Sequence, residues 1–282
     1  MEWFDAHNHL QDERLDLCRD ELVHVARDAG VRAMVVNDCC ESDWQPVADL
    51  AARYPGFVIP AFGYHPWYVG ERTAQWQSRL IRFLETIPGA VIGEIGIDRW
   101  ILNQSKDRLR KVAPGIVGAP PEMPEQEDVF LWQLQLASNY QLPASIHCLD
   151  AFGRLHELLS EQTRLHRGFL LHSYGGSREM VPIFVELGAH FSFPGYFAHD
   201  RKSRRREAFM DVPLDRLLIE TDAPDQVPPP SLSPFSAIDR RGTIWNHPAN
   251  LPAIGKYLAK VRGLPELALS EKLKENFERL FL

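Results

Sequence analysis

The chain has 282 residues, 45% of them hydrophobic and 24% charged, which is typical of a globular protein with a large buried core. Its net charge of −7 excludes a general basic field that attracts nucleic acid or membrane, although a local patch or a metal can still hold phosphate. No apolar run approaches the roughly 20 residues that span a bilayer, and four cysteines without zinc-finger spacing suit a reducing compartment. We therefore expect a cytoplasmic protein with no membrane segment and no obligate protein partner.

Short apolar or β-branched runs alternate with longer amphipathic stretches along most of the chain. This alternation predicts right-handed βα units and a parallel sheet. Eight such strands favour an α/β fold of the TIM type, a closed (β/α)8 barrel that commonly occupies about 250 residues as one domain; an open doubly wound sheet is the alternative. The predicted strands are residues 3–6, 31–37, 57–62, 90–95, 144–147, 169–171, 190–193 and 217–220. The predicted helices include residues 15–29, 76–86, 129–140, 151–161, 177–187 and 204–210.

Two segments break this alternation. Residues 103–125 follow the fourth strand, are basic in their first half and rich in Pro and Gly in their second, and are too long for a plain barrel loop, so we interpret them as an insertion or lid. Residues 227–234 contain four prolines and predict a stiff loop after the eighth strand. The C-terminal helices are predicted over residues 248–282, with a break near residues 263–265.

Histidines and carboxylates fall at the carboxyl ends of six of the predicted strands. His7 and His9 are two residues apart on the first strand, so both side chains point to the same face. A lone histidine in an apolar strand is more often a hydrogen-bonded core residue, but several polar groups in one barrel mouth are costly without a cation. The active sites of such barrels lie on the rim that the carboxyl ends of the strands form, so the pattern predicts a metal site there. Its other members are His65, Glu94, His147, His172 and Asp222.

The donor set constrains the metal. Four imidazoles, a Glu and an Asp exceed the needs of one tetrahedral zinc, and they include no thiolate. Two divalent ions (zinc, manganese or magnesium) bridged by Glu94 account for all of these donors. Such a pair acidifies a water and clamps the attacking and leaving oxygens, and Asp222 is the natural group to orient that water and accept its proton. We therefore predict Asp222 and Glu94 as the catalytic carboxylates.

Seven short motifs occur in order along nearly the whole chain. They are D-A-H-N-H-L at 5–10, G-Y-H-P at 63–66, G-E-I-G-I-D at 93–98, S-I-H-C at 145–148, L-H-S-Y-G-G at 171–176, E-T-D-A-P at 220–224 and N-F-E-R-L-F at 276–281. This set resembles the motifs of the TatD family of metal-dependent hydrolases, which are related to the amidohydrolases and are often described as deoxyribonucleases.

This resemblance implies the same barrel, a phosphodiester or DNA substrate, and a role for each motif histidine. His65 is expected to contact substrate phosphate rather than metal. The implied metal ligands are His7, His9 and Asp222 on one ion, His147 and His172 on the other, and Glu94 as the bridge.

Three departures from the family pattern surround the site without touching a ligand. Leu149 stands where the family commonly has an arginine, Arg99 stands where an aromatic residue is frequent, and the segment 103–125 is longer than expected. These departures leave the substrate open. A basic run at residues 201–206 follows the seventh strand and is either a phosphate contact or a solvated helix face.

We therefore expect a divalent-metal-dependent phosphodiesterase or deoxyribonuclease that uses a two-metal-activated water. An alternative keeps the metals but cleaves a carboxylic ester, amide or aminoacyl ester, which Leu149 slightly favours. A remote alternative is a non-catalytic module that keeps a structural metal.

Overall fold

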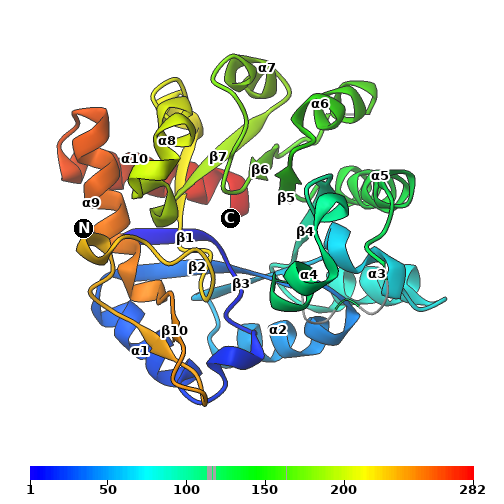
Figure 1. Ribbon diagram of the computed structural model, residues 1–282, viewed down its shortest axis with the longest axis horizontal. Coiled ribbons are helices and arrows are strands. Elements are labelled where there is room, and N and C mark those ends of the chain that lie inside the picture. Colours follow the sequence, from blue (N-terminus) through cyan, green and yellow to red (C-terminus); the bar gives the residue numbers. More distant parts are fainter. Residues whose placement is uncertain (113–115, 117–118, 163) are drawn as a thin grey trace.

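A computed structural model describes residues 1–112, 116, 119–162 and 164–282. Eight parallel strands form one sheet in the order β1 to β8, with helices arranged around the outside (Figure 1). Backbone hydrogen bonds from Asp222 N to His7 O (3.0 Å) and from His9 N to Ala223 O (2.8 Å) join the carboxyl ends of β8 and β1. The predicted (β/α)8 barrel is therefore confirmed. Its strands are β1 (Trp3–Asn8), β2 (Val31–Asn37), β3 (Val58–Phe62), β4 (Val91–Asp98), β5 (Ala144–Leu149), β6 (Phe169–Leu171), β7 (Ala189–Pro194) and β8 (Leu217–Glu220).

Helices alternate with the strands and two more follow β8. Among the described residues the α-helices are α1 (Arg19–Asp28), α2 (Glu41–Arg53), α3 (Trp76–Thr86), α4 (Lys106–Val112), α5 (Met123–Tyr140), α6 (Phe152–Glu161), α7 (Met180–Glu186), α8 (Ser203–Ala208), α9 (Leu251–Arg262) and α10 (Glu266–Phe281). Short 3-10 helices are η1 (Glu13–Leu15), η2 (Pro66–Glu71), η3 (Ile101–Asn103), η4 (Gly195–Ala198), η5 (Asp200–Lys202), η6 (Leu214–Arg216), η7 (Pro230–Leu232) and η8 (Pro248–Asn250). In the described part of the chain, no helix is both long and apolar enough to cross a membrane.

The barrel interior is divided into an apolar end and a polar end. Inward-facing residues near the amino ends of the strands form an apolar cluster, and α10 packs against it with Phe277, Leu280 and Phe281. Toward the carboxyl ends the buried interior instead holds acids, histidines and serines. Residues two apart on a strand point to the same face. One strand can therefore supply the interior with an apolar residue near its amino end and a polar residue nearer its carboxyl end. The apolar strand residues of the cluster are Phe4, Ala6, Ala33, Val35, Ile59, Ala61, Val91, Leu170 and Leu218.

The segment predicted as an insertion is partly helical. Its described residues include α4, and α5 begins at Met123 rather than at 129, since Pro124 occupies the first turn, where a missing N–H costs nothing. Residues 113–115 and 117–118 of the predicted insertion lie outside the described residues.

Three other features can be compared with the predictions. The first helix begins at Arg19, not at residue 15, because η1 occupies the preceding turn. Gly263 ends α9 with a φ of 63°, which places the C-terminal break where it was predicted. A small antiparallel pair, β9 (Ala237–Ile238) and β10 (Ile244–Trp245), lies after the proline-rich loop and was not predicted.

Candidate metal centre

All seven residues singled out from the sequence meet at the carboxyl end of the barrel interior. His7 lies within β1 and His9 one residue beyond it, with their Nε2 atoms 3.3 Å apart. Glu94 lies in the middle of β4 rather than at its end, because the strand continues to Asp98, and the predicted end at residue 95 was wrong. Six of the seven are buried and His9 is half-buried, so the centre is deep in the barrel mouth.

The two carboxylate oxygens of Glu94 face two separate groups of histidines. Its Oε2 lies 3.4 Å from Nε2 of His7 and 3.4 Å from Nε2 of His9. Its Oε1 lies 3.0 Å from Nδ1 of His147 and 2.9 Å from Nε2 of His172. This is the arrangement that a bridging carboxylate requires, with one oxygen directed to each side.

Asp222 completes the group around His7 and His9. Its Oδ1 lies 3.6 Å from Nε2 of His7 and 3.5 Å from Nε2 of His9. Its other oxygen accepts a hydrogen bond of 2.6 Å from Nε2 of Gln226, which fixes the orientation of the carboxylate. The His172 ring stacks on His7 with centroids 3.9 Å apart, which brings the two groups into contact.

The spacing of these atoms suits divalent cations. Two ligand atoms that each lie about 2.1 Å from one tetrahedral ion are about 3.4 Å apart. The separation is 3.3 Å between His7 Nε2 and His9 Nε2 and 3.2 Å between His147 Nδ1 and His172 Nε2. Three sets of donors each lie within 4.8 Å of one another: His7, His9 and Glu94; His7, His172 and Asp222; and His65, Glu94 and His147.

The local electrostatics also favour positive charge here. Burial opposes ionisation of Glu94, but the imidazoles of His172, His65 and His7 outweigh it and hold the pKa of this carboxyl well below its usual range. Burial likewise opposes a charge on His9, yet Asp222 and Glu94 raise the pKa of His9 to about 9. Glu94 and Glu220 overcome burial in the same way and raise the pKa of His172 well above its ordinary value. A cation would therefore meet a field that already stabilises positive charge.

On two of the rings, a hydrogen bond on the far side selects the nitrogen that faces the centre. Nδ1 of His9 donates to the carbonyl of Asn37 (2.8 Å), so in the neutral ring that a metal would bind, the lone pair is on Nε2. Nε2 of His147 donates to Oδ2 of Asp98 (2.9 Å), which leaves the lone pair on Nδ1. Carboxylate–histidine pairs of this kind orient metal ligands and increase their basicity.

Asp98 is thus part of the centre, although the sequence did not single it out as a site residue. Its Oδ1 also accepts from the backbone N–H of Ile101 (3.0 Å) at the start of η3. A sequence signal was available, since Asp98 is four residues after Glu94 and even offsets in a strand share a face. Ser145 (3.0 Å from His7 Nδ1) and Glu220 (3.8 Å from His172 Nδ1) are further buried neighbours that were not predicted.

His65 differs from the other histidines in its hydrogen bonding. Its Nδ1 accepts from the backbone N–H of Trp67 (3.2 Å), so the hydrogen of the neutral ring is on Nε2. That Nε2 lies 3.4 Å from Oε1 of Glu94. Burial lowers the pKa of His65 to about 4, so the ring is neutral near pH 7. The side chain is therefore arranged as a hydrogen-bond donor, and it has no free lone pair for a metal.

Backbone geometry and Asp5 hold these side chains in register. A Cβ on Gly96, whose φ is +148°, would lie 2.0 Å from the carbonyl oxygen of His147, so β4 approaches β5 too closely for any other residue. Asp5 accepts from the backbone N–H (2.9 Å) and hydroxyl (2.5 Å) of Thr221, next to Asp222. The first motif is thereby tied directly to the last.

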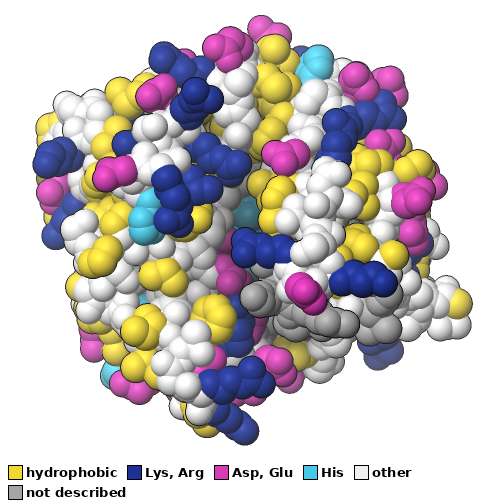
Figure 2. All heavy atoms as spheres, in the orientation of Figure 1, with side chains coloured by type: hydrophobic (Ala, Val, Ile, Leu, Met, Phe, Trp, Pro, Cys, Tyr) yellow, Lys and Arg dark blue, Asp and Glu magenta, His cyan; other side chains and the backbone are white. Residues whose placement is uncertain are grey.

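The basic run at residues 201–206 is divided between packing and the rim. Arg206 donates to the carbonyl of Phe197 (2.9 Å) and has a structural contact. Arg205 lies against the loop that follows His172, since a Cβ on Gly175 would be 2.7 Å from its Nη1. Figure 2 shows Lys and Arg side chains gathered beside a central hollow, over the region of α8 in Figure 1.

The second basic segment begins in α4. Lys106 and Arg108 are exposed, whereas the side chains of Arg110 and Lys111 lie outside the described residues.

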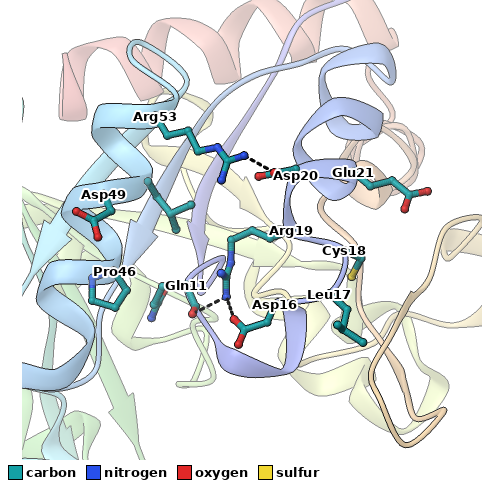
Figure 3. Close-up of a pocket in the computed structure, with 11 residues that line it drawn as sticks. Gln11, Asp16, Leu17, Cys18, Arg19, Asp20, Glu21, Pro46, Asp49 and Arg53 are labelled. Carbon is teal, nitrogen blue, oxygen red and sulfur yellow. Dashed lines mark hydrogen bonds and ion pairs between the residues drawn. The ribbon is translucent and has the colours of Figure 1, made fainter.

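A separate groove of about 540 Å³ lies between α1 and α2 (Figure 3). None of the seven predicted site residues lines it, and the charges of Arg53 and Arg19 are paired with Asp20 and Asp16. We assign no chemistry to this groove.

Known proteins are similar to this chain in sequence and in fold. The family model described as TatD related DNase matches residues 4–282. The chain is 29% identical over 279 residues to the 3'-5' ssDNA/RNA exonuclease TatD of Erwinia billingiae, covering 99% of this chain and 98% of that protein. It is 30% identical over 280 residues to the protein of the same name from a Rahnella species, covering 99% and 97%.

A solved structure of a TatD homologue from Escherichia coli superposes with a TM-score of 0.83 at 24% identity, over 99% of this chain and 97% of that one. The resemblance predicted from the motifs is confirmed. The chain belongs to the TatD-related DNase family of metal-dependent hydrolases.

Proposed function

We propose that this protein hydrolyses phosphodiester bonds at the ends of single-stranded nucleic acid, DNA above all, with two divalent ions. The observation that carries the proposal is the position of Glu94, whose two oxygens face separate groups of donors. The names of the relatives from Erwinia and Rahnella, which describe 3'-5' exonucleases of single-stranded DNA and RNA, support this substrate class.

The ligand assignment follows from which nitrogen each ring presents. We assign one ion to His7, His9 and Asp222, and the other to His147 and His172, with Glu94 shared. The ions are zinc, manganese or magnesium; imidazole-rich ligation favours zinc or manganese. The chemistry that two such ions supply when bound is neutralisation of charge on phosphate oxygens and acidification of the attacking water.

The protein's own groups complete the reaction. Asp222 orients the water and accepts its proton, while the bond from Gln226 keeps that carboxylate in place. His65 presents an Nε2–H donor beside Glu94 and stabilises negative charge on a phosphate oxygen or on the leaving oxygen.

The surroundings of the centre favour a single strand. Glu94 is 1% exposed and His7 is completely buried, so a phosphate must enter the barrel mouth to reach them. A single strand can bring its phosphate to that depth more easily than a duplex, which is wider. Arg205, held against Gly175 on the rim, is placed to contact the phosphate of a strand that enters.

The test uses protein stripped of metal with a chelator and reloaded with manganese, magnesium or zinc. Release of nucleotides from end-labelled single-stranded DNA should require the metal and should disappear in His7→Ala and Asp222→Asn. His24→Ala is the control, because His24 is exposed on the outer helix α1.

Other outcomes separate the alternatives. Hydrolysis of carboxylic ester, amide or aminoacyl ester substrates, with DNA, RNA and small phosphodiesters left intact, would replace phosphoester chemistry with carbonyl chemistry. A single tightly held ion without hydrolysis of any substrate would support a non-catalytic module.

We also propose that residues 1–282 act as one catalytic unit in the cytoplasm. All four cysteines are free thiols, which suits a reducing compartment.

A further inference from the structure

Two tryptophans lie together at the rim on the His147 side of the metal centre. Trp67 is in η2, two residues after His65, and Trp100 is two residues after the end of β4. Their rings stack with centroids 6.2 Å apart and an angle of 29° between the planes. Both side chains are only half-buried, so part of this aromatic surface is open to an incoming molecule.

The pair is close to the reacting groups and is held there. The Trp67 ring lies 5.1 Å from the His65 ring and 6.1 Å from the His147 ring, measured between centroids. Its indole N–H donates to Oδ2 of Asp98 (2.6 Å), the same oxygen that accepts from His147. Because the only polar hydrogen of the side chain is used internally, what Trp67 offers to the mouth is an oriented aromatic surface.

Simple rim packing is the alternative explanation, and a comparison with Tyr196 argues against it. The Tyr196 ring is already covered by Arg201, whose Cζ is 5.2 Å from its centroid, and by Lys202, whose Nζ is 4.7 Å away. Its hydroxyl is taken by Arg201 as well. A base could stack there only by displacing these cations, whereas the tryptophan pair is adjacent to the centre and partly uncovered.

We propose that Trp67 and Trp100 form a stacking platform for a nucleobase of the substrate, next to the nucleotide whose phosphate reaches the metal centre. The inference rests on the proposed function, and it adds a binding site for the base. Every base has an aromatic face, so the platform accepts different sequences. It gives the protein a preference for nucleotides over phosphodiesters that lack a base.

The first test separates base binding from turnover. In the metal-loaded protein, thymidine 5′-monophosphate should quench tryptophan fluorescence and bind roughly tenfold or more tightly than deoxyribose 5-phosphate. Trp100→Ala should remove both the quenching and the difference in affinity, and Trp100→Phe should restore most of the difference. Trp132→Ala is the matched control, because Trp132 is half-buried on α5 and packs against Trp76 of α3, in the outer layer of helices (Figure 1).

The second test uses hydrolysis. Trp100→Ala should raise KM for an oligothymidylate roughly tenfold or more with little change in kcat, and should leave kcat/KM unchanged for an oligonucleotide of abasic sites. Equal binding of the two monophosphates, or an unchanged KM in Trp100→Ala, would overturn the platform. Absence of all nucleic-acid hydrolysis in the wild type would overturn the proposed function instead, and the monophosphate comparison would still decide the platform.

Discussion

The two ends of the barrel interior both bury histidines, but only one end gives them partners. At the carboxyl end, five histidines each have a ring nitrogen within 3.4 Å of Glu94. Near the amino end, His190 in β7 is 2% exposed and has no hydrogen-bond partner on either nitrogen. Burial in an apolar strand is therefore common to both, and the carboxylates make the difference between a structural histidine and a candidate ligand.

The largest expected effect comes from removing the shared carboxylate. Glu94→Gln keeps the shape of the side chain but removes the charge that both groups of histidines face. We expect it to weaken binding of both ions and to reduce phosphodiester hydrolysis by on the order of 10³-fold or more. Metal content after dialysis and steady-state rates measure these effects, with His24→Ala as the control. Normal rates and a full metal content would show that Glu94 does not hold the centre together.

A smaller effect is expected from the partner of a single ligand. Asp98→Asn removes the charge that accepts from His147 and from Trp67. Loss of such a partner typically weakens metal affinity by roughly 10–100-fold, which chelator competition would measure. Asp150→Asn is the matched control, since Asp150 is exposed just beyond β5. Equal affinities in the two variants would mean that Asp98 does not support metal binding and serves only the backbone at Ile101.

A still smaller effect is expected from moving a rim cation. A methyl group on Gly175 would displace the end of Arg205 and leave the metal centre intact. For single-stranded DNA, Gly175→Ala should raise KM several-fold at low salt and lower the salt dependence of binding, because one phosphate contact is lost. Gly153→Ala is the control, as a Cβ there meets no atom within 4 Å. An unchanged salt dependence would remove Arg205 from the substrate path.

The smallest effect on catalysis is expected at the other end of the barrel. Burial, together with the nearby charges of Arg216 and Arg279, which Asp215 partly offsets, lowers the pKa of His190 to about 3. In the unfolded chain, His190 has an ordinary pKa near 6.5 and binds a proton at a higher pH than it does in the folded protein. Its contribution to stability is therefore fully present above pH 6.5 and is lost as the pH falls toward 3.

His190→Phe should leave hydrolysis almost unchanged. When the pH is lowered from 7 to 5, its free energy of unfolding should fall by about 2 kcal/mol less than that of the wild type. Urea denaturation at the two pH values measures this difference. An equal loss in wild type and variant would show that His190 is not held neutral. A strong loss of activity at pH 7 would contradict the division of the barrel into two ends.

Much of the barrel was predictable because its strands are short apolar runs between helical patterns. The meeting of the seven candidate residues at one end of the barrel was predictable because they lie between the middle of a strand and a point just beyond its carboxyl end, in six of the eight strands. The start of α5 was missed since Pro124, which suits the first turn of a helix, was grouped with a Pro- and Gly-rich loop. The pair β9 and β10 was missed because strands of two residues have no periodicity.

What the sequence did not reveal were the contacts between distant residues. Asp98 is four positions from Glu94, yet its bond to His147 joins residues 49 positions apart. The roles of Trp67 depend on where its indole and backbone N–H groups point, which no motif encodes. The contrast between His190 and the five histidines at the other end likewise depends on three-dimensional neighbours.

The most direct test of the central claim is anomalous scattering from crystals of the zinc-loaded protein. The account predicts two peaks, one between Glu94 Oε2 and the His7–His9 pair, and one between Glu94 Oε1 and the His147–His172 pair. A single peak, or two peaks that do not share Glu94, would contradict it.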